Sequence, residues 1–506
     1  MTARDRVPMN WGAGARAGAS SLDSAEAATT MPGEWLARRL GARGALLFLI
    51  GGCVRSAVAP EPTQPVDPCL IAPAPAVAPE SLSIALTERS SQGLSVSSPV
   101  GGPRAVQKLM YENLIAVDCT GAFVAELAER WEIDSTGRRW IFTIRDDARW
   151  PSGQPVTARD VTAAWRSLHG HQSAFARVLD STQAIDDHRI RVALDDGDAR
   201  VLAAQELTIL LRASDTDRFQ GTGAYGEGGV PRQAQKPSGE SVRLPRLQLV
   251  TLDPLLDGRD VLDRGVDLML TDDPSVARYA MERKGLAVYP LPPQRSYAVV
   301  SSKQLAPDDS LNVALSTLRA SLAEDVVEVP ARPVSTPWWL SEVASCALTA
   351  GVRSAAAQAA LRHVAYREDD PVARAIAERL VSLSSRDDDS VAKRLMGAVG
   401  DAASGPVAAE AMHPDDFAQA LRDRTRAAFV VSLPARPVAR CSAVADVARA
   451  IPWAVLDSTV DRGFVTPLVD AGAWAIVRRG AVGIAADWDG TPRLVFSSSP
   501  SQDGVR

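Results

Sequence analysis

The sequence predicts an α/β protein with more than one domain. In its later part, residues 361–367 and 427–431 are strand-like, and residues 371–380 and 415–421 have the apolar spacing of helices. Asp370-Pro371 supplies the cap and the first-turn proline of the helix that follows. Strands that alternate with helices are typical of an α/β fold. The chain of 506 residues is long enough for two or three domains with substantial cores.

The first elements of the globular part follow from local patterns. Residues 81–86 alternate between polar and apolar side chains, which predicts a strand. Further along, Val106, Leu109 and Met110 recur at helical spacing. We therefore expect a helix from Arg104 to Ile115 with one face against a core.

A hairpin and a capped helix come next. Residues 131–133 and 140–144 are predicted strands, joined by the turn sequence Asp134-Ser135-Thr136-Gly137. Thr157 is followed three residues later by Asp160, which is the spacing of a capping box. A helix is expected to begin there.

Composition excludes some classes of function. The hydrophobic fraction of 46% and the charged fraction of 23% are those of an ordinary globular protein. The formal net charge of -6 argues against a broad surface for nucleic acid. We therefore expect no nucleic-acid partner.

No motif of covalent catalysis is present. The sequence lacks the HExxH, CxxC, Gly-x-Ser-x-Gly and Walker-type patterns. His169-Gly170-His171 can in principle chelate a metal, but a solvated loop at a helix end explains so short a run better. We assign no catalytic residue, no metal site and no cofactor, and we expect that the protein is not an enzyme.

The N-terminal part has the layout of an export signal. Three arginines, at 38, 39 and 43, precede the apolar residues 45–50, and Gly51-Gly52-Cys53 follow. The apolar run is much shorter than the ~20 residues that span a bilayer as a helix. Ile50-Gly51-Gly52-Cys53 resembles the lipobox of bacterial lipoproteins, in which the cysteine carries the lipid. We predict a signal peptide over 1–52 and lipidation of Cys53; the alternative is an ordinary secretory signal with an incidental cysteine.

A proline- and alanine-rich stretch follows the predicted lipidation site. Residues 54–80 contain seven prolines, at 60, 62, 65, 68, 73, 75 and 79. Such composition favours extended, semi-rigid backbone. We predict a linker over 53–80 that holds a folded body away from a membrane.

The order of several short motifs resembles one known family. The motifs lie at Leu109–Leu114 (LMYENL), Ala125–Trp131 (AELAERW), Trp140–Arg145 (WIFTIR), Trp150–Val161 (WPSGQPVTARDV), Gly221–Tyr225 (GTGAY) and Asp263–Leu268 (DRGVDL). Together they resemble the family-5 extracytoplasmic solute-binding proteins of ABC importers, whose members bind oligopeptides, dipeptides and nickel.

The resemblance implies an architecture. Members of the family have a periplasmic-binding-protein fold of class II, cluster C, in which two α/β lobes enclose the ligand in a cleft. On this basis we expect the chain to cross between lobes near 292–302 and to return near 451–466. The expected boundaries are lobe 1 at 81–295, lobe 2 at 296–455, and a C-terminal return to lobe 1 at 456–506.

The resemblance also implies a function. It predicts a monomeric, lipid-anchored binding protein outside the cytoplasm, which captures a peptide-like solute by lobe closure and delivers it to an ABC permease. Two departures leave the ligand class open: Tyr297–Ser302 lacks the family's asparagine, and Asn312–Arg319 lacks its Asp-Arg pair. The alternative is an envelope scaffold or sensor with a remodelled or lost pocket; a hydrolase on a related two-lobed frame is less favoured.

The candidate ligand-binding residues come from their positions relative to the predicted crossover and strands. They are Thr87, Glu88, Arg89, Arg295, Tyr297, Trp338 and Trp339. The planar donor fork of Arg295 suits a ligand carboxylate, although a surface arginine without this role is the simpler reading. The two tryptophans can stack on a ligand or serve only in core packing.

Four cysteines remain if Cys53 carries a lipid. An oxidising compartment permits up to two disulfides. Pairing Cys69 with Cys119 and Cys346 with Cys441 keeps each bridge within one predicted lobe. Four buried free thiols are the alternative.

Overall fold

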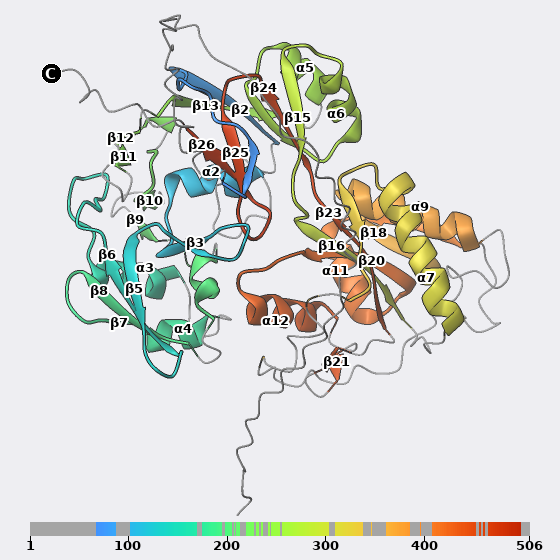
Figure 1. Ribbon diagram of the computed structural model, residues 1–506. Coiled ribbons are helices and arrows are strands. Elements are labelled where there is room, and N and C mark those ends of the chain that lie inside the picture. The colour runs from blue at the N-terminus through green and yellow to red at the C-terminus, as the bar shows by residue number, and fades with distance from the viewer. Residues whose placement is uncertain are drawn as a thin grey trace, which may run out of the picture. The chain divides into compact units, whose positions relative to one another are not determined.

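The computed structural model describes most of the globular body, all of it within the compact unit Gln64–Arg506 (Figure 1). The described residues are 67–87, 102–168, 175–194, 198–204, 207, 209–212, 219–226, 229–231, 234–235, 241–242, 244–252, 256–302, 309–336, 338, 346, 361–384, 395, 407–451, 455–456, 459–460 and 464–496. The predicted signal peptide, Cys53, Glu88, Arg89, His169 to His171 and Trp339 lie outside them. Within these ranges, no helix has the length and apolar character needed to cross a bilayer.

A five-stranded sheet forms the centre of the first lobe. Its order is β13 (Arg246–Leu252), β2 (Ser81–Thr87), β14 (Leu268–Thr271), β24 (Trp474–Arg478) and β15 (Leu286–Pro290). β13 and β14 run parallel to β2, whereas β24 is antiparallel to both of its neighbours. Helices α5 (Gly258–Asp263) and α6 (Pro274–Met281) pack on one face through residues that include Val261 and Val276. Helix α2 (Gly102–Met110) packs on the other through Val106 and Met110.

A four-stranded antiparallel sheet belongs to the same part of the chain. Its order is β5 (Ala128–Ile133), β6 (Arg139–Ile144), β8 (Arg189–Ala193) and β7 (Gln183–Ala184), and it packs with α3 (Ala158–Leu168) and α4 (Ala176–Ser181). The predicted hairpin is confirmed, because Asp134 Oδ1 accepts the backbone N–H of Thr136 and Gly137 has a φ of 71°. The predicted capping box is also confirmed: Thr157 N–H donates to Asp160 Oδ2 at 2.8 Å.

Several short elements complete this part of the structure. They are β1 (Leu70–Ala72), β3 (Ile115–Val117), β4 (Phe123–Ala125), the 3-10 helix η1 (Ala199–Ala203), β9 (Leu210–Arg212), β10 (Phe219–Gly221), β11 (Ala234–Gln235), β12 (Ser241–Val242), β25 (Gly483–Ala486) and β26 (Pro492–Val495).

The predicted linker extends too far into the folded body. Residues 70–72 form β1, which pairs antiparallel with β25, so they lie in a three-stranded sheet with β26. Cys69 is 3% exposed and is bonded to Cys119. The proline-rich composition concealed this strand, because three residues are too few to show an alternating pattern. The range 53–80 therefore includes residues that belong to the fold.

Helix α2 is shorter than predicted. It ends at Met110 rather than Ile115, and residues 115–117 form β3 instead. The carbonyl oxygen of Met110 accepts the backbone N–H of Gly223 at 3.0 Å, and that of Leu109 accepts from Tyr225 at 2.9 Å. A Cβ atom at Gly223 would lie 2.5 Å from the carbonyl carbon of Met110. Backbone N–H groups of the segment Gly221–Tyr225 thus pair with the last carbonyl groups of the helix, and only glycine fits at position 223.

A six-stranded sheet forms the second lobe. Its order is β17 (Ala331–Pro333), β23 (Val465–Ala471), β16 (Arg295–Ser301), β20 (Arg426–Pro434), β18 (Leu361–Arg367) and β19 (Ala408–Met412). Helices α7 (Asp309–Ser321) and α9 (Pro371–Ser384) pack on one face, together with the π-helix η4 (Leu322–Val326). Helices α11 (Pro414–Asp423) and α12 (Arg440–Ala450) pack on the other (Figure 1). The short strands β21 (Val455–Leu456) and β22 (Thr459–Val460) pair with each other.

The chain passes between the two larger sheets twice. The first passage, residues 291–294 between β15 and β16, overlaps the crossover predicted near 292–302. The return was predicted near 451–466, with the C-terminal part of lobe 1 starting at 456. Instead the chain stays in the second sheet through Ala471, because β23 is a fully buried strand that pairs with β16. The return therefore lies at Gly472 and Ala473.

Both predicted disulfides are present. Cys69 is bonded to Cys119, and Cys346 is bonded to Cys441. The first holds β1 against the loop after β3, and the second connects residue 346 to the first turn of α12. The alternative of four free thiols does not apply.

Candidate functional site

The second sheet has a topology that places a crevice at one edge. Strands β18, β19 and β20 are parallel, and β18 lies between the other two. The chain leaves β18 into α9 on one face and leaves β19 into α11 on the other. In open α/β sheets, such a reversal opens a crevice at the carboxyl ends of the strands, where ligands commonly bind.

A pocket of about 380 Å³ occupies this edge. It is lined by Arg367, Asp370, Ala373, Pro414, Phe417, Ala418, Leu421, Arg422, Val430, Val431, Ser432 and Leu433. These residues come from the ends of β18 and β20 and from helices α9 and α11. The volume and the mostly apolar lining with a few polar groups are those of small-molecule sites, which span ~300–1,000 Å³.

A tyrosine from the crossover strand reaches the pocket rim. The Tyr297 hydroxyl group donates to Asp370 Oδ1 at 3.1 Å. Asp370 Oδ1 also accepts the backbone N–H of Ala373 at 2.9 Å and so caps α9. Burial and the negative charge of Asp370 raise the pKa of Tyr297 well above its usual value, so this hydroxyl group stays protonated.

Two arginines of the rim have different partners. Arg367 donates to both oxygens of Asp369, at 3.0 and 2.8 Å. Arg295 donates through Nη1 to the Ser432 hydroxyl oxygen at 2.9 Å. Within the described ranges Arg295 forms no ion pair, so its positive charge is neutralised less completely than that of Arg367.

Asp272 contributes a negative charge from the first sheet. It directly follows β14, and its carboxyl group interacts electrostatically with Arg295 and Asp370. Its side chain remains accessible to solvent, yet the surrounding protein desolvates the charged form and raises its pKa. The negative charge of Asp370 raises it further, whereas Arg295 opposes the shift.

The structure describes four of the seven candidate residues. Arg295 and Tyr297 lie on β16 at the edge that carries the pocket. The Trp338 Nε1–H donates to the carbonyl oxygen of Pro434, at the end of β20, and its ring packs against the core on the α11 face. Thr87 ends β2 in the other sheet, and its side chain is outside the described set. A ligand contact of any of these residues stays a prediction.

Sequence reasoning missed most of the pocket. Asp370 was predicted only as the cap of a helix, and Ser432 and Arg422 were not predicted at all. The cap was visible because Asp370 precedes a proline, but its contact with Tyr297 joins residues 73 positions apart. No local pattern carries such information.

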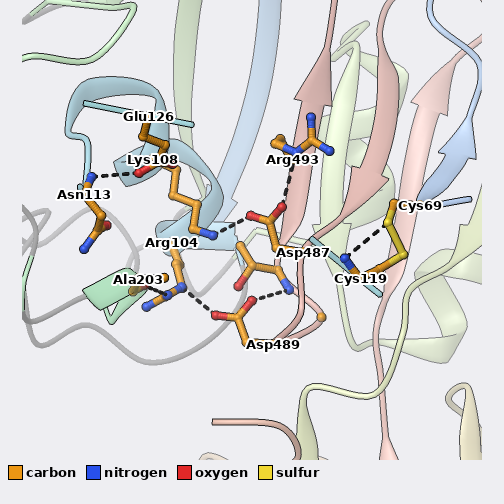
Figure 2. Close-up of polar contacts among 12 residues, drawn as sticks. Cys69, Arg104, Lys108, Asn113, Cys119, Glu126, Ala203, Asp487, Asp489 and Arg493 are labelled. Atoms are coloured by element: carbon orange, nitrogen blue, oxygen red, sulfur yellow. Dashed lines mark hydrogen bonds and ion pairs between the residues drawn. A yellow bond between two sulfur atoms is a disulfide. The ribbon is translucent and has the colours of Figure 1, made fainter. Parts of the chain in front are cut away.

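A second polar cluster, in the first lobe, connects α2 to the C-terminal strands (Figure 2). Lys108 of α2 pairs with Asp487, which also pairs with Arg493 at 3.2 Å. Arg104 of the same helix pairs with Asp489 at 2.9 Å. These contacts join segments nearly 400 residues apart, so we assign the cluster a structural role.

The same cluster contains a carboxyl group with a displaced pKa. Glu126 Oε2 accepts the backbone N–H of Asn113 at 2.8 Å (Figure 2). Burial raises the pKa of Glu126 to about 7, while the charge of Lys108 opposes the shift. Among the described residues, no group of three or more His, Cys, Asp or Glu side chains is arranged to hold a metal ion.

Comparison with solved structures shows which fold the chain shares. The chain is similar to the murein tripeptide binding protein MppA of Escherichia coli, with a TM-score of 0.52 and 15% identity over 79% of this chain and 94% of that one. It is also similar to NikZ of Campylobacter jejuni in complex with Ni(L-His), with a TM-score of 0.53 and 13% identity over 82% and 98% of the two chains. The predicted two-lobed α/β fold of solute-binding proteins is confirmed.

Part of the chain is similar in sequence to one family. Residues 122–228 match the model of the bacterial extracellular solute-binding proteins, family 5 middle region. A segment of 59 residues is 41% identical to the periplasmic oligopeptide-binding protein OppA of Haemophilus influenzae, and covers 12% of this chain and 11% of that protein. A segment of 113 residues is 28% identical to OppA of E. coli, over 18% and 21% of the two chains. The resemblance to family 5 is thereby confirmed, although the aligned segments span no more than about a fifth of these relatives.

Proposed function

We propose that the protein is the solute-binding component of an ABC importer and that it captures a peptide-like solute at the edge of the second sheet. The observation that carries this proposal is the pocket at the carboxyl ends of β18 and β20, with Arg295 and Tyr297 from the crossover strand at its rim. A site next to the passage between two lobes changes shape when the lobes move, so ligand binding can be coupled to lobe closure. Relatives whose names describe oligopeptide binding support a peptide-like solute.

The location and partners belong to the same proposal. The lipobox-like sequence before Cys53 supports export and anchorage to a membrane by a lipid. A monomer held there by the linker is within reach of an ABC permease, which is the proposed partner. No covalent chemistry is required of the protein.

A thermal-shift screen tests the function. The purified chain is heated in the presence of dipeptides, oligopeptides or nickel, one class at a time. Because a ligand that binds only the folded state stabilises it, a true ligand raises the melting temperature in a concentration-dependent way. If no class does so, the transport function is wrong, and the alternative of an envelope scaffold or sensor with a lost pocket is favoured.

A further inference from the structure

The carboxylates at the pocket rim are already engaged by protein groups. Both oxygens of Asp369 accept from Arg367. Asp370 accepts from the Tyr297 hydroxyl group and from the backbone N–H of Ala373. Each of these carboxylates therefore has part of its acceptor capacity and of its negative charge already satisfied by protein groups.

The guanidinium groups at the same rim have more unused capacity. Arg422 lines the pocket and donates to the neutral Gln419 Oε1 at 2.8 Å, and Arg295 donates to the neutral Ser432 hydroxyl oxygen. In the part of the chain that the structure describes, neither arginine forms an ion pair. A guanidinium has five N–H donors, so both arginines retain donors for an anion. The Ser432 hydroxyl group accepts from Arg295 and donates its own proton to no group among the described residues.

The rest of the lining is apolar. Its members are Ala373, Pro414, Phe417, Ala418, Leu421, Val430, Val431 and Leu433. An apolar group that enters this pocket loses contact with water, which is favourable at roughly 25 cal/mol per Å² of buried surface. The lining therefore suits an aliphatic or aromatic group of the solute rather than a charged one.

We propose that this pocket holds its solute by a carboxylate beside an apolar group, and that it does not require a free amino group on the solute. The proposal rests on the proposed function and specifies the class of solute. The carboxylate accepts from Arg295 and from the Ser432 hydroxyl group, the apolar group fills the lining, and Arg422 supplies a second positive charge. An N-blocked apolar peptide or a simple apolar carboxylic acid meets these requirements.

Asp272 distinguishes this binding mode from recognition of an amino group. Its carboxyl group interacts with Arg295 and Asp370 and has no side-chain hydrogen-bond partner among the described residues. A bound ammonium group near Arg295 would gain from this negative charge, whereas a bound carboxylate is repelled by it. The substitution Asp272→Asn therefore has opposite effects on the two kinds of solute.

Four forms of one dipeptide test the proposal by calorimetric titration of the full chain. Leu-Leu is zwitterionic, N-acetyl-Leu-Leu is anionic, Leu-Leu-amide is cationic and N-acetyl-Leu-Leu-amide is neutral. We expect N-acetyl-Leu-Leu to bind at least as well as Leu-Leu. The two amides should bind about tenfold more weakly or worse, because a charge-assisted hydrogen bond is lost.

Variants locate the carboxylate. Arg295→Gln and Ser432→Ala should each weaken binding of N-acetyl-Leu-Leu, whereas Asp272→Asn should strengthen it. Arg374→Gln is the matched control, because Arg374 is an exposed arginine of α9 that pairs with Glu378 and does not line the pocket. Circular dichroism confirms that each variant is folded, and Ser432→Ala, which removes only a hydroxyl oxygen, serves if Arg295→Gln does not fold.

The outcomes separate this proposal from the proposed function. If Leu-Leu-amide binds more tightly than N-acetyl-Leu-Leu, and Asp272→Asn weakens its binding, the carboxylate mode is wrong and the solute-binding function stands. If none of the four probes binds and no peptide or nickel class raises the melting temperature, both are wrong.

Discussion

The hydroxyl group of Tyr297 donates a hydrogen bond to Asp370 Oδ1 at 3.1 Å, and the same oxygen accepts the backbone N–H of Ala373. Tyr297 lies on β16, the strand that follows the first passage between the sheets, and Asp370 begins α9. One carboxylate thus connects the crossover strand to a helix that lines the pocket. Because the Tyr297 side chain is buried, water cannot easily replace its hydroxyl group.

Replacing Tyr297 by phenylalanine should destabilise the protein. The substitution keeps the ring and removes one donor from a partly buried carboxylate, so we expect the free energy of unfolding to fall by about 1–3 kcal/mol. Urea denaturation followed by circular dichroism measures the change. Tyr289→Phe is the control, because within the described ranges the Tyr289 hydroxyl group makes no hydrogen bond. Equal losses for both variants would show that the contact with Asp370 contributes nothing.

Stability should depend on the protonation of Glu126. Its pKa of about 7 in the folded chain lies above its ordinary value of 4.5, so folding favours the protonated form. The resulting contribution to the free energy of unfolding is fully present at pH values below 4.5 and is lost as the pH rises through 7. We expect the free energy of unfolding to decrease from pH 5 to pH 8 by on the order of 2 kcal/mol because of this group.

Glu126→Gln tests this pH dependence. Glutamine can still accept the backbone N–H of Asn113 but does not titrate, so the decrease between pH 5 and pH 8 should become smaller. Glu129→Gln is the matched control, because that side chain is 37% exposed. Urea denaturation at pH 5, 6, 7 and 8 provides the comparison. An unchanged pH profile in the Glu126 variant would show that another group causes the decrease.

The sequence predicted the elements whose determinants are local. The turn from Asp134 to Gly137 and the capping box of Thr157 and Asp160 each depend on residues a few positions apart, and both are confirmed. Helix α2 was predicted too long because its end is set by the distant Gly223, whose N–H bonds to Met110. The apolar spacing continued past the point where tertiary contacts stop the helix.

The candidate site likewise contains residues that the sequence predicted and residues that only tertiary contacts bring to it. Arg295 and Tyr297 were predicted from their position at the crossover, which motif order reveals. Asp370 and Ser432 became part of the site only through pairing of β16 with β20 and packing of α9, which depend on the whole sheet. The late return at Gly472 was missed for the same reason: the neighbour of β23 is a strand about 170 residues earlier.

Loss of the Cys69–Cys119 disulfide should cost considerable stability. The bond closes a loop with a sequence separation of 50, for which the chain-entropy estimate is about 4 kcal/mol. The double variant Cys69→Ser with Cys119→Ser should therefore unfold at a lower urea concentration without reductant. Adding reductant should lower the urea midpoint of the native chain by more than it lowers that of the double variant. If the double variant were as stable as the native chain, the bridge would not constrain the unfolded state.

Anchorage should depend on Cys53. Removal of the thiol leaves no attachment point for the predicted lipid, so Cys53→Ala should move the protein from the membrane fraction to the soluble fraction. Its circular dichroism spectrum should not change, because the described fold begins further along the chain. Ser56→Ala is a control that leaves the lipobox-like sequence intact. A Cys53→Ala protein that remained in the membrane fraction would contradict lipid anchorage through this residue.

Gly472 should be indispensable where the two passages between the sheets meet. Leu291 N–H donates to the carbonyl oxygen of Ala473 at 2.9 Å, and Gln294 N–H donates to that of Ala471 at 2.9 Å, so the two segments lie side by side. A Cβ atom at Gly472 would overlap the carbonyl oxygen of Leu291. Because the added Cβ atom would overlap backbone rather than a flexible side chain, neither segment can relax without losing hydrogen bonds. We expect Gly472→Ala to lower the free energy of unfolding by about 2 kcal/mol or more.

The control for this substitution is Gly285→Ala, at a glycine of the first lobe where an added Cβ atom meets nothing within 4 Å. We expect its midpoint in urea to change little, whereas that of Gly472→Ala falls clearly. Ligand binding adds a second readout, because the passages are the segments that must bend when the lobes move. A Gly472→Ala protein with native stability and native affinity for a solute would mean that the two passages separate without cost, and that their close contact does not restrain the lobes.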